Sequence, residues 1–335
     1  MKRAHGLFRK RLKDPLKVRD AWDRLTPDPR GDGLGRADLV LEAIVEDADA
    51  KRQLFAGIEP RLHEDALLAT NTSSIPLEVL GDGLRRPERL LGLHFFNPVA
   101  RMELVEVVRG QGSASAAIDR AVAFVHGLGR LPLPVQSSPG FLVNRILMPY
   151  LLEAVELLQE GLTAPAIDRA AEAFGMPMGP IALADSVGLD ICLAVAEEIG
   201  PRLSIPNSAP ELMRERVHQG ALGKKTGEGF YRYRNGNRVS RGHARVRRSP
   251  PDLAERMIFR LLNESVACLR EGIGDDAELL DAGVVFGTGF APFRGGPMHF
   301  NAEGGQARML SRLRDLEAIH GSHFHPDRGW RALQV

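Results

Sequence analysis

The sequence predicts an α/β part, with a parallel or mixed sheet covered on both faces, followed by an all-helical part. Between about residues 37 and 136, short apolar runs alternate with helical patterns. After the segment SSPGF at 137–141, the apolar residues recur at helical spacing only. A chain of 335 residues is also long enough for more than one hydrophobic core.

The elements of the first part follow from its apolar periodicity. A strand is expected wherever a short apolar run is bounded by turn residues, and a helix wherever an amphipathic run joins two strands. The expected strands are 37–46, 66–74, 89–96, 104–110 and 130–136, and the expected helices are 47–62 and 113–129.

The second part is predicted to contain two similar helical units. A long helix at 141–161 ends at Gly161, and further helical patterns occupy 164–177 and 179–200. The turn-rich segment at 224–233 precedes a polar, basic stretch at 234–251, which is typical of a solvated linker, although its arginines would also suit phosphate.

An internal repeat supports the second helical unit. Residues 145–162 align without gaps to residues 256–273, and Arg145/Arg256, Glu153/Glu264, Val155/Val266, Leu158/Leu269 and Gly161/Gly272 match. FGMPMGPI at 174–181 resembles FGTGFAPF at 286–293. Two helical units that pack together are therefore expected, and the predicted divisions of the chain are 1–137, 138–234 and 251–335.

Composition excludes several classes of partner. The net charge of +1 provides no single-sign field for nucleic acid or anionic membrane. No apolar run reaches the roughly 18 residues of a membrane span. The basic N-terminus lacks the apolar core of a secretory signal, and Asp14, Asp20 and Asp23 disfavour a mitochondrial presequence. A cytoplasmic protein is expected.

No metal site is predicted. Cys192 and Cys268 are far apart and lie in apolar helical patterns, so both are expected to be buried structural thiols. His320, His323 and His325 have no accompanying cysteine or carboxylate cluster and are interpreted as a surface segment near the C-terminus.

Two polar residues interrupt the predicted strands at 89–96 and 104–110. His94 and Glu106 each stand among apolar neighbours. An ionised carboxylate in a dry strand needs a partner, and His94 on the neighbouring strand is the candidate. A carboxylate that holds an imidazole in one tautomer and stabilises its cation makes a general base. An inert core ion pair is the alternative, and these two residues alone do not decide between them.

Two further polar residues are predicted to meet this pair. Ser73 follows a strand at the carboxyl edge of the sheet, where open α/β sheets bind ligands. Asn144 lies in the first turn of the helix that opens the second part. An N-cap role for Ser73 and a capping or hinge role for Asn144 are the structural alternatives. Together with His94 and Glu106 they could converge on a cleft between the two parts.

Several segments carry a family resemblance. ADLVLEAIVEDADAK, NTSSIPLEVL, GLHFFNPVARMELVEVVRG, SSPGFLVNRI, GMPMGPIALADSVGLD and GKKTGEGFYRY resemble, in order and spacing, the 3-hydroxyacyl-CoA dehydrogenase family. The resemblance covers about residues 37 to 330. The repeated helical unit is similar to the dehydrogenase part of the multifunctional fatty-acid oxidation enzyme, in which an enoyl-CoA hydratase domain usually precedes this one.

This resemblance implies NAD-dependent oxidation of an L-3-hydroxyacyl-CoA to the 3-ketoacyl-CoA in fatty-acid β-oxidation. His94 would be the general base oriented by Glu106, while Ser73 and Asn144 would bind the substrate oxygen. Phe300 stands where the family has a tyrosine that contacts substrate. The implied partners are acyl-CoA and either a second copy of the chain or hydratase and thiolase components. The implied cofactor-binding residues are Ile44, Val45, Glu46, Lys51, Ser73, Asn97 and Lys225.

One family feature is absent from the sequence. A dinucleotide-binding fold begins with a strand followed by G-x-G-x-x-G at a helix start. Here GDGLGR at 31–36 does not fit this motif, because it reads G-x-G-x-G and precedes a predicted strand instead of following one. The expected fold is an incomplete Rossmann-type domain, in an N-terminally truncated chain, with an exposed sheet edge. The segment at 7–28 resembles the helix after the family's second strand.

Two rival functions remain at this point. A non-catalytic remnant that binds acyl-CoA or a partner subunit is the first, and the missing glycine motif favours it. A 3-hydroxyacid dehydrogenase acting on a free acid is the second, but HFFNP at 94–98 and the doubled helical unit disfavour it.

Overall fold

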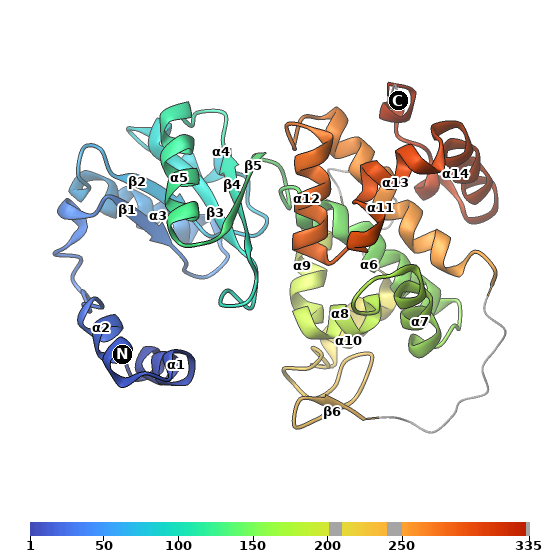
Figure 1. Ribbon diagram of the computed structural model, residues 1–335, viewed down its shortest axis with the longest axis horizontal. Coiled ribbons are helices and arrows are strands. Elements are labelled where there is room, and N and C mark those ends of the chain that lie inside the picture. The colour runs from blue at the N-terminus through green and yellow to red at the C-terminus, as the bar shows by residue number, and fades with distance from the viewer. Residues whose placement is uncertain (201–209, 240–249, 333–335) are drawn as a thin grey trace.

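The computed structural model describes residues 1–200, 210–239 and 250–332. Figure 1 shows the sheet and the helical part side by side, with the chain passing from one to the other between β5 and α6. Most of the predicted basic linker, residues 240–249, lies outside the described residues. Among those described, no helix is both long and apolar enough to cross a bilayer.

The sheet contains five strands in sequence order, β1-β2-β3-β4-β5. β1 to β3 run parallel, β4 is antiparallel to β3, and β5 is parallel to β4, so the sheet is mixed. Each predicted strand is present but shorter, because the polar residues at the predicted ends form loops. The strands are β1 (Leu39–Glu42), β2 (Leu67–Thr70), β3 (Leu90–Phe95), β4 (Leu104–Arg109) and β5 (Leu131–Gln136).

Helices cover both faces of the sheet, as the apolar strands require. Helix α5 (Ser115–Gly127) packs on the face that carries Leu67 and Leu91. Helix α3 (Ala48–Ile58) and the short helix α4 (Leu77–Gly81), which the periodicity did not predict, contact the opposite face. Neighbouring residues of β2 therefore belong to different cores, as strand alternation dictates.

The N-terminal segment forms two helices instead of one continuous helix. α1 (Lys2–Leu12) ends before α2 (Pro15–Asp23), because a proline is tolerated only in the first turn of a helix. No residue of α2 is buried, and Figure 1 shows both helices away from the sheet. The glycine-rich segment forms a turn immediately before β1, in which Asp28 accepts hydrogen bonds from the amides of Asp32 and Gly33.

The first helical unit begins with α6, the long helix predicted at 141–161. The predicted helical pattern at 179–200 is broken at Gly188, whose φ is 111°. Residues 233–238, partly assigned to the linker, form a hairpin instead, because Asn235 and Gly236 have the positive φ of a tight turn. The elements are α6 (Val143–Gln159), α7 (Ala164–Phe174), α8 (Pro180–Val187), α9 (Leu189–Ile199), α10 (Glu211–His218), β6 (Tyr233–Arg234) and β7 (Asn237–Arg238).

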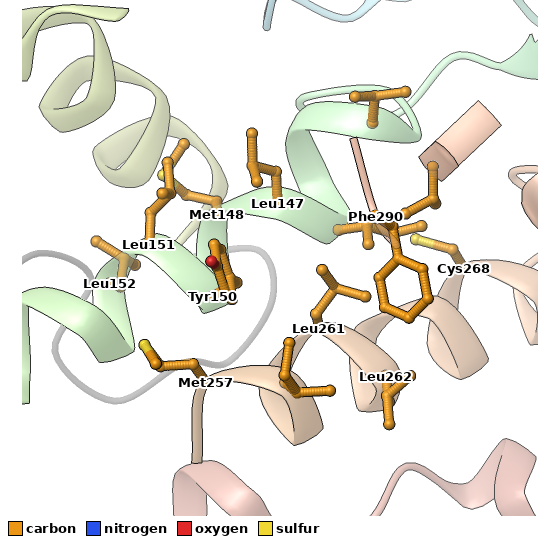
Figure 2. Packing of buried hydrophobic residues seen from close by; sticks show 14 of the residues in the cluster. Leu147, Met148, Tyr150, Leu151, Leu152, Met257, Leu261, Leu262, Cys268 and Phe290 are labelled. Atoms are coloured by element: carbon orange, nitrogen blue, oxygen red, sulfur yellow. The ribbon is translucent and has the colours of Figure 1, made fainter. Parts of the chain in front are cut away.

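The second helical unit packs on the first along α6 and α11. The two helices bury a shared apolar face that contains Tyr150, Leu151, Met257 and Leu261 (Figure 2). This core continues into β4 and β5, and both cysteines are buried, as predicted. The unit comprises α11 (Leu253–Arg270), α12 (Ala277–Thr288), α13 (Pro297–Gly304) and α14 (Gln306–His320), followed by short 3-10 turns at Ser322–Phe324 and Arg328–Arg331.

The repeat is visible as an exchange of ion pairs between equivalent positions. Arg145 of α6 binds Glu264 of α11 at 2.7 Å, and Arg256 of α11 binds Glu153 of α6 at 2.7 Å. Since Arg145 is equivalent to Arg256, and Glu153 to Glu264, each unit makes the same contact to the other.

A second shared feature corrects one sequence pairing. A buried aspartate accepts a backbone N–H bond at the start of a following helix in both units: Asp168 at α8 and Asp281 at α13. In each case a glycine-proline pair, at 179–180 or 296–297, begins that helix close to the carboxylate. The equivalent of the MGPI motif is therefore at 295–298, so the pairing with 286–293 was wrong by a few residues.

Candidate active site

His94 and Glu106 face each other directly across the antiparallel pair β3 and β4. His94 Nδ1 lies 2.7 Å from Glu106 Oε2, and the two residues are 4% and 0% exposed. The residues that flank them, Leu93, Phe95, Val105 and Val107, all pack in the core beneath α5, so both polar side chains point to the opposite face of the sheet. The buried carboxylate has the partner that the sequence required.

The N-terminus of α6 supplies two more donors to Glu106. The backbone N–H groups of Leu142 and Val143 donate to Oε1 at 3.1 and 2.9 Å. Helix N-termini stabilise negative charge, and α6 has no side-chain cap of its own. Sequence reasoning missed these donors. The available signal was SSPGF, where Gly140 and Phe141 adopt φ of 74° and 51° and turn the chain into the helix.

Asn144 joins this helix to the loop after β2. Its Nδ2 donates to the carbonyl oxygen of Ser73 at 3.2 Å. Because Asn144 follows directly after Val143, the four predicted residues form one continuous chain of contacts, Ser73–Asn144–α6 N-terminus–Glu106–His94. Within the described residues, the Ser73 hydroxyl and His94 Nε2 make no hydrogen bond, so both are available to a ligand.

A charge cluster made of the buried Glu42 and Lys51 and the exposed Glu46 supports the loop that carries Ser73. Glu46 Oε1 accepts hydrogen bonds from the Thr72 hydroxyl at 2.6 Å and from the Ser73 amide at 2.8 Å. Lys51, which is fully buried, lies 2.7 Å from Glu42 and 3.3 Å from Glu46. The structure thus places Glu46 and Lys51 behind the loop, and their predicted contact with a cofactor stays a prediction.

The predicted cofactor-binding residues Ile44, Val45, Ser73 and Asn97 lie in loops at the carboxyl ends of β1, β2 and β3. Ile44 and Val45 follow β1 and are 45% and 68% exposed, so both side chains are accessible to a ligand. Ser73 stands on the next loop, and the exposed Asn97 follows β3. The residues that would hold the pyrophosphate in a glycine-rich turn are not among those at this edge.

Two predicted site residues lie elsewhere in the described chain. Lys225 is exposed and binds Asp190 of α9 at 2.7 Å. Phe300 of α13 packs its ring against Phe174 at 5.4 Å and Phe290 at 6.5 Å, at the contact between the helical units. In the described residues, neither makes a hydrogen bond, ion pair or ring contact with the Ser73–His94 group, so their roles stay predictions.

The three late histidines are not a free surface segment. His320 binds Asp252 at 2.8 Å and His323 lies 3.4 Å from Glu153, and both histidines are partly buried. Only His325, which contacts Glu317, is largely exposed. These contacts attach the end of the chain to α6 and α11. No cluster of three metal-ligand side chains occurs in the described parts of the chain.

Known proteins match both parts of the chain. Residues 2–138 match the family model "3-hydroxyacyl-CoA dehydrogenase, NAD binding domain", and residues 140–233 match "3-hydroxyacyl-CoA dehydrogenase, C-terminal domain". The fatty acid oxidation complex subunit alpha of Shewanella sp. (strain ANA-3) is 38% identical over 312 residues, which is 88% of this chain and 43% of that protein. The subunit from Pseudomonas aeruginosa is 36% identical over 93% of this chain and 46% of its own length.

Solved structures agree. The 3-hydroxybutyryl-CoA dehydrogenase of Escherichia coli K12 superposes with a TM-score of 0.86 at 26% identity, covering 99% of this chain and 89% of that one. The dehydrogenase part of multifunctional enzyme 1 from C. elegans gives 0.67 at 25% identity, covering 97% and 79%. The chain spans less than half the length of the curated relatives above. It belongs to the 3-hydroxyacyl-CoA dehydrogenase family of oxidoreductases.

Proposed function

We propose that this chain carries the site that oxidises an L-3-hydroxyacyl-CoA to the 3-ketoacyl-CoA with NAD in fatty-acid β-oxidation. The observation that supports it most is the 2.7 Å contact between His94 and the buried Glu106, held at the N-terminus of α6. A carboxylate that accepts two amide hydrogen bonds is stabilised in its ionised form, and an ionised carboxylate can only accept hydrogen bonds.

The contact selects the tautomer of a neutral His94. If Glu106 accepts, Nδ1–H donates, and Nε2 is then the basic nitrogen of the neutral imidazole. Nε2 would take the proton from the substrate 3-hydroxyl, and Glu106 would stabilise the imidazolium that results. Assistance of this kind contributes roughly 10²–10⁴-fold to a rate. In the reverse direction, the imidazolium returns the proton to the 3-keto oxygen.

Ser73 and Asn144 would bind the reacting oxygen. Both lie at the junction of the β2 loop with α6, and Ser73 has a free hydroxyl in the described structure. A hydroxyl and an amide N–H can both donate to the oxygen as it gains negative charge. The Ser73 backbone is itself held by Glu46, so the loop is ordered before a ligand arrives.

NAD, when bound, accepts the hydride that leaves C3 of the substrate. Ile44, Val45 and Asn97 would contact its nicotinamide end, with Ser73 nearby. Glu46 and Lys51 would contribute from beneath the loop, and Lys225 from the helical part. Phe300 lies where the two helical units meet, so it would contact the substrate only if the substrate extends to that interface.

Further proposals follow for the units of the chain, its substrate, its partners and its location. We propose three units at 1–137, 138–234 and 251–335, with the first a partial NAD-binding domain. An acyl-CoA is the proposed substrate, and a second copy of the chain or hydratase and thiolase components are the proposed partners. A cytoplasmic location stays a prediction from composition.

The test is NADH oxidation dependent on acetoacetyl-CoA by the purified chain. His94→Gln removes the basic nitrogen and keeps a polar side chain, so we expect kcat to fall roughly 10²–10⁴-fold. His126→Gln is the matched control, because His126 is an exposed histidine on α5, on the sheet face away from the dyad. Circular dichroism should show both variants folded.

Two outcomes would contradict this proposal. Equal activity in the two variants would remove His94 from the mechanism. A folded wild-type chain that binds acetoacetyl-CoA without any turnover would support the rival, a non-catalytic acyl-CoA-binding protein.

A further inference from the structure

A large cavity lies on the helical part, away from the dyad. It has a volume of about 790 Å³, within the roughly 300–1,000 Å³ typical of small-molecule sites. Its walls come from α11, α14, the start of α6 and the C-terminal 3-10 turns. None of Ser73, His94, Glu106 and Asn144 lines it. The cavity is therefore distinct from the proposed active site.

The lining of the cavity is rich in arginine. Six arginines and four acidic residues line it, which is a formal surplus of two positive charges. The four carboxylates are already engaged, because Arg145 and Arg270 bind three of them and His325 binds Glu317. In the described chain the other four arginines have no carboxylate partner, and they are Arg260, Arg314, Arg328 and Arg331.

Arg260 is the unusual member of this group. It is only 8% exposed, its Nε is buried without a hydrogen-bond partner in the described structure, and its guanidinium donates to the carbonyl oxygen of His323. Burial lowers its pKa, although Glu153 and Glu264 act in the opposite direction. A buried guanidinium that forms no direct ion pair is costly, and a bound anion would reduce that cost.

Hydrogen bonds and an ion pair join two walls of the cavity, α11 and the C-terminal 3-10 turns. Asn263 of α11 accepts hydrogen bonds from the Asp327 amide and from the Trp330 indole, both at 2.8 Å. Arg270 binds Asp327 at 2.7 Å. The C-terminal turns that carry Arg328 are therefore fixed to the helix that carries Arg260, so the backbone positions of these two arginines are preorganised around the cavity.

We propose that this cavity binds the phosphate groups of a nucleotide-type ligand, with Arg260 as the buried donor and Arg314 and Arg328 as exposed donors. Guanidinium groups match phosphate oxygens with paired hydrogen bonds, and several arginines around one cavity favour more than one phosphate. Both the 3′-phosphorylated ADP end of a CoA thioester and a free nucleotide carry this chemistry. The inference does not depend on the proposed dehydrogenase activity.

The test is titration calorimetry of the full chain with inorganic pyrophosphate at low ionic strength. We expect wild-type binding, and for Arg314→Gln/Arg328→Gln a Kd roughly tenfold or more higher, because two charge-assisted contacts are lost. Arg308→Gln is the matched control, since Arg308 is an exposed arginine on α14 that does not line the cavity. Arg260→Lys keeps the charge but removes Nε, and should also weaken binding.

Because Arg314 and Arg328 are exposed, their substitution should not impair folding, and melting temperatures would verify this. Competition identifies the source of the phosphates. Displacement of pyrophosphate by CoA but not by 3′-dephospho-CoA would indicate the CoA end, and equal displacement by ADP would indicate a free nucleotide. The proposal is overturned if pyrophosphate does not bind the wild-type chain, or if the double variant binds it as tightly as the Arg308→Gln control.

Discussion

At the scale of single residues, the site depends on the groups that compensate the charge of one buried carboxylate. Glu106 divides its two oxygens between His94 and the first amides of α6. The imidazole was predictable, because a carboxylate inside an apolar strand needs a partner. The two amides were not predictable, because every residue type except proline carries a backbone N–H group. The consequence is a dyad whose orientation is tied to a helix of the second part.

The first residue-scale prediction concerns Glu106→Gln. The amide oxygen can still accept from the α6 amides, but the amide nitrogen can only donate to His94 Nδ1. His94 would then carry its proton on Nε2, which is the wrong tautomer for a base. We expect kcat to fall roughly 10²–10⁴-fold while the free energy of unfolding changes by no more than about 1 kcal/mol. Steady-state kinetics and urea denaturation measure the two quantities.

Glu106→Ala provides the contrast. It leaves the amides of Leu142 and Val143 buried without an acceptor and opens a void, so unfolding free energy should fall by about 2–4 kcal/mol. Full activity in the Glu106→Gln variant would show that Glu106 has a structural role only.

At the scale of elements, α6 and α11 are held by two equivalent ion-pair networks. Burial raises the pKa of Glu153, but contacts with His323 and Arg256 outweigh it and hold that pKa below its ordinary value. Arg256 also binds the more exposed Glu160 at 2.6 Å. The arginine is therefore the counter-charge for a carboxylate that is 2% exposed.

We predict that Arg256→Met lowers the free energy of unfolding by about 3 kcal/mol, because Glu153 loses its main partner. Adding Glu153→Leu should recover much of this loss, since an apolar pair can replace a buried ion pair. Arg312→Met is the matched control: its pair with the exposed Glu255 should contribute less than about 1 kcal/mol. Chemical denaturation measures the free energy of unfolding of each variant. Equal losses for Arg256→Met and Arg312→Met would contradict this prediction.

At the scale of the whole molecule, the second helical unit completes the core of the first. Figure 2 shows side chains of α6 and α11 in one apolar cluster, and this cluster reaches β4 and β5. The backbone of β5 also meets the second unit, where the Gln136 amide donates to the Ile273 carbonyl at 2.9 Å. The helical units and the sheet are therefore coupled through shared burial.

The stability of this assembly should depend on pH through Asp281. Burial raises its pKa to about 6, although the amides of Met298 and His299 favour the charged form. Between about pH 4 and 6 the folded chain holds a proton that the unfolded chain has lost, so stability rises as the pH falls through this range. Relative to Asp281→Asn, the wild-type free energy of unfolding should rise by up to about 3 kcal/mol from pH 7 to pH 4.

Denaturant midpoints across this pH range would measure the difference. The same measurement on Asp275→Asn, an exposed aspartate just before α12, separates the effect of burial from general loss of charge. A wild-type advantage that instead grew toward pH 7 would contradict the predicted sign.

The strands, the long helices and the repeat were predictable because each follows from local apolar periodicity. The break in the helix at Gly188 and the hairpin at 233–238 were not predicted. Each had a local signal, Gly188 for the break and Asn235-Gly236 for the turn of the hairpin. The proximity of Ser73, His94, Glu106 and Asn144 was predicted, and their roles in catalysis stay predictions. The supporting roles of Glu46 and the α6 amides were not predicted, because they depend on which loops meet in space.

The sequence by itself determined the order of elements, the family and the residue types of the site, because periodicity and motif spacing are properties of one chain segment at a time. Only the tertiary structure decided how charges are paired. It placed Glu106 at a helix N-terminus, exchanged ion pairs between α6 and α11, and left the Nε of the buried Arg260 without a hydrogen-bond partner among the described residues. The physical reason is that compensation of a buried charge depends on atoms within a few ångströms, and folding brings these from distant parts of the sequence.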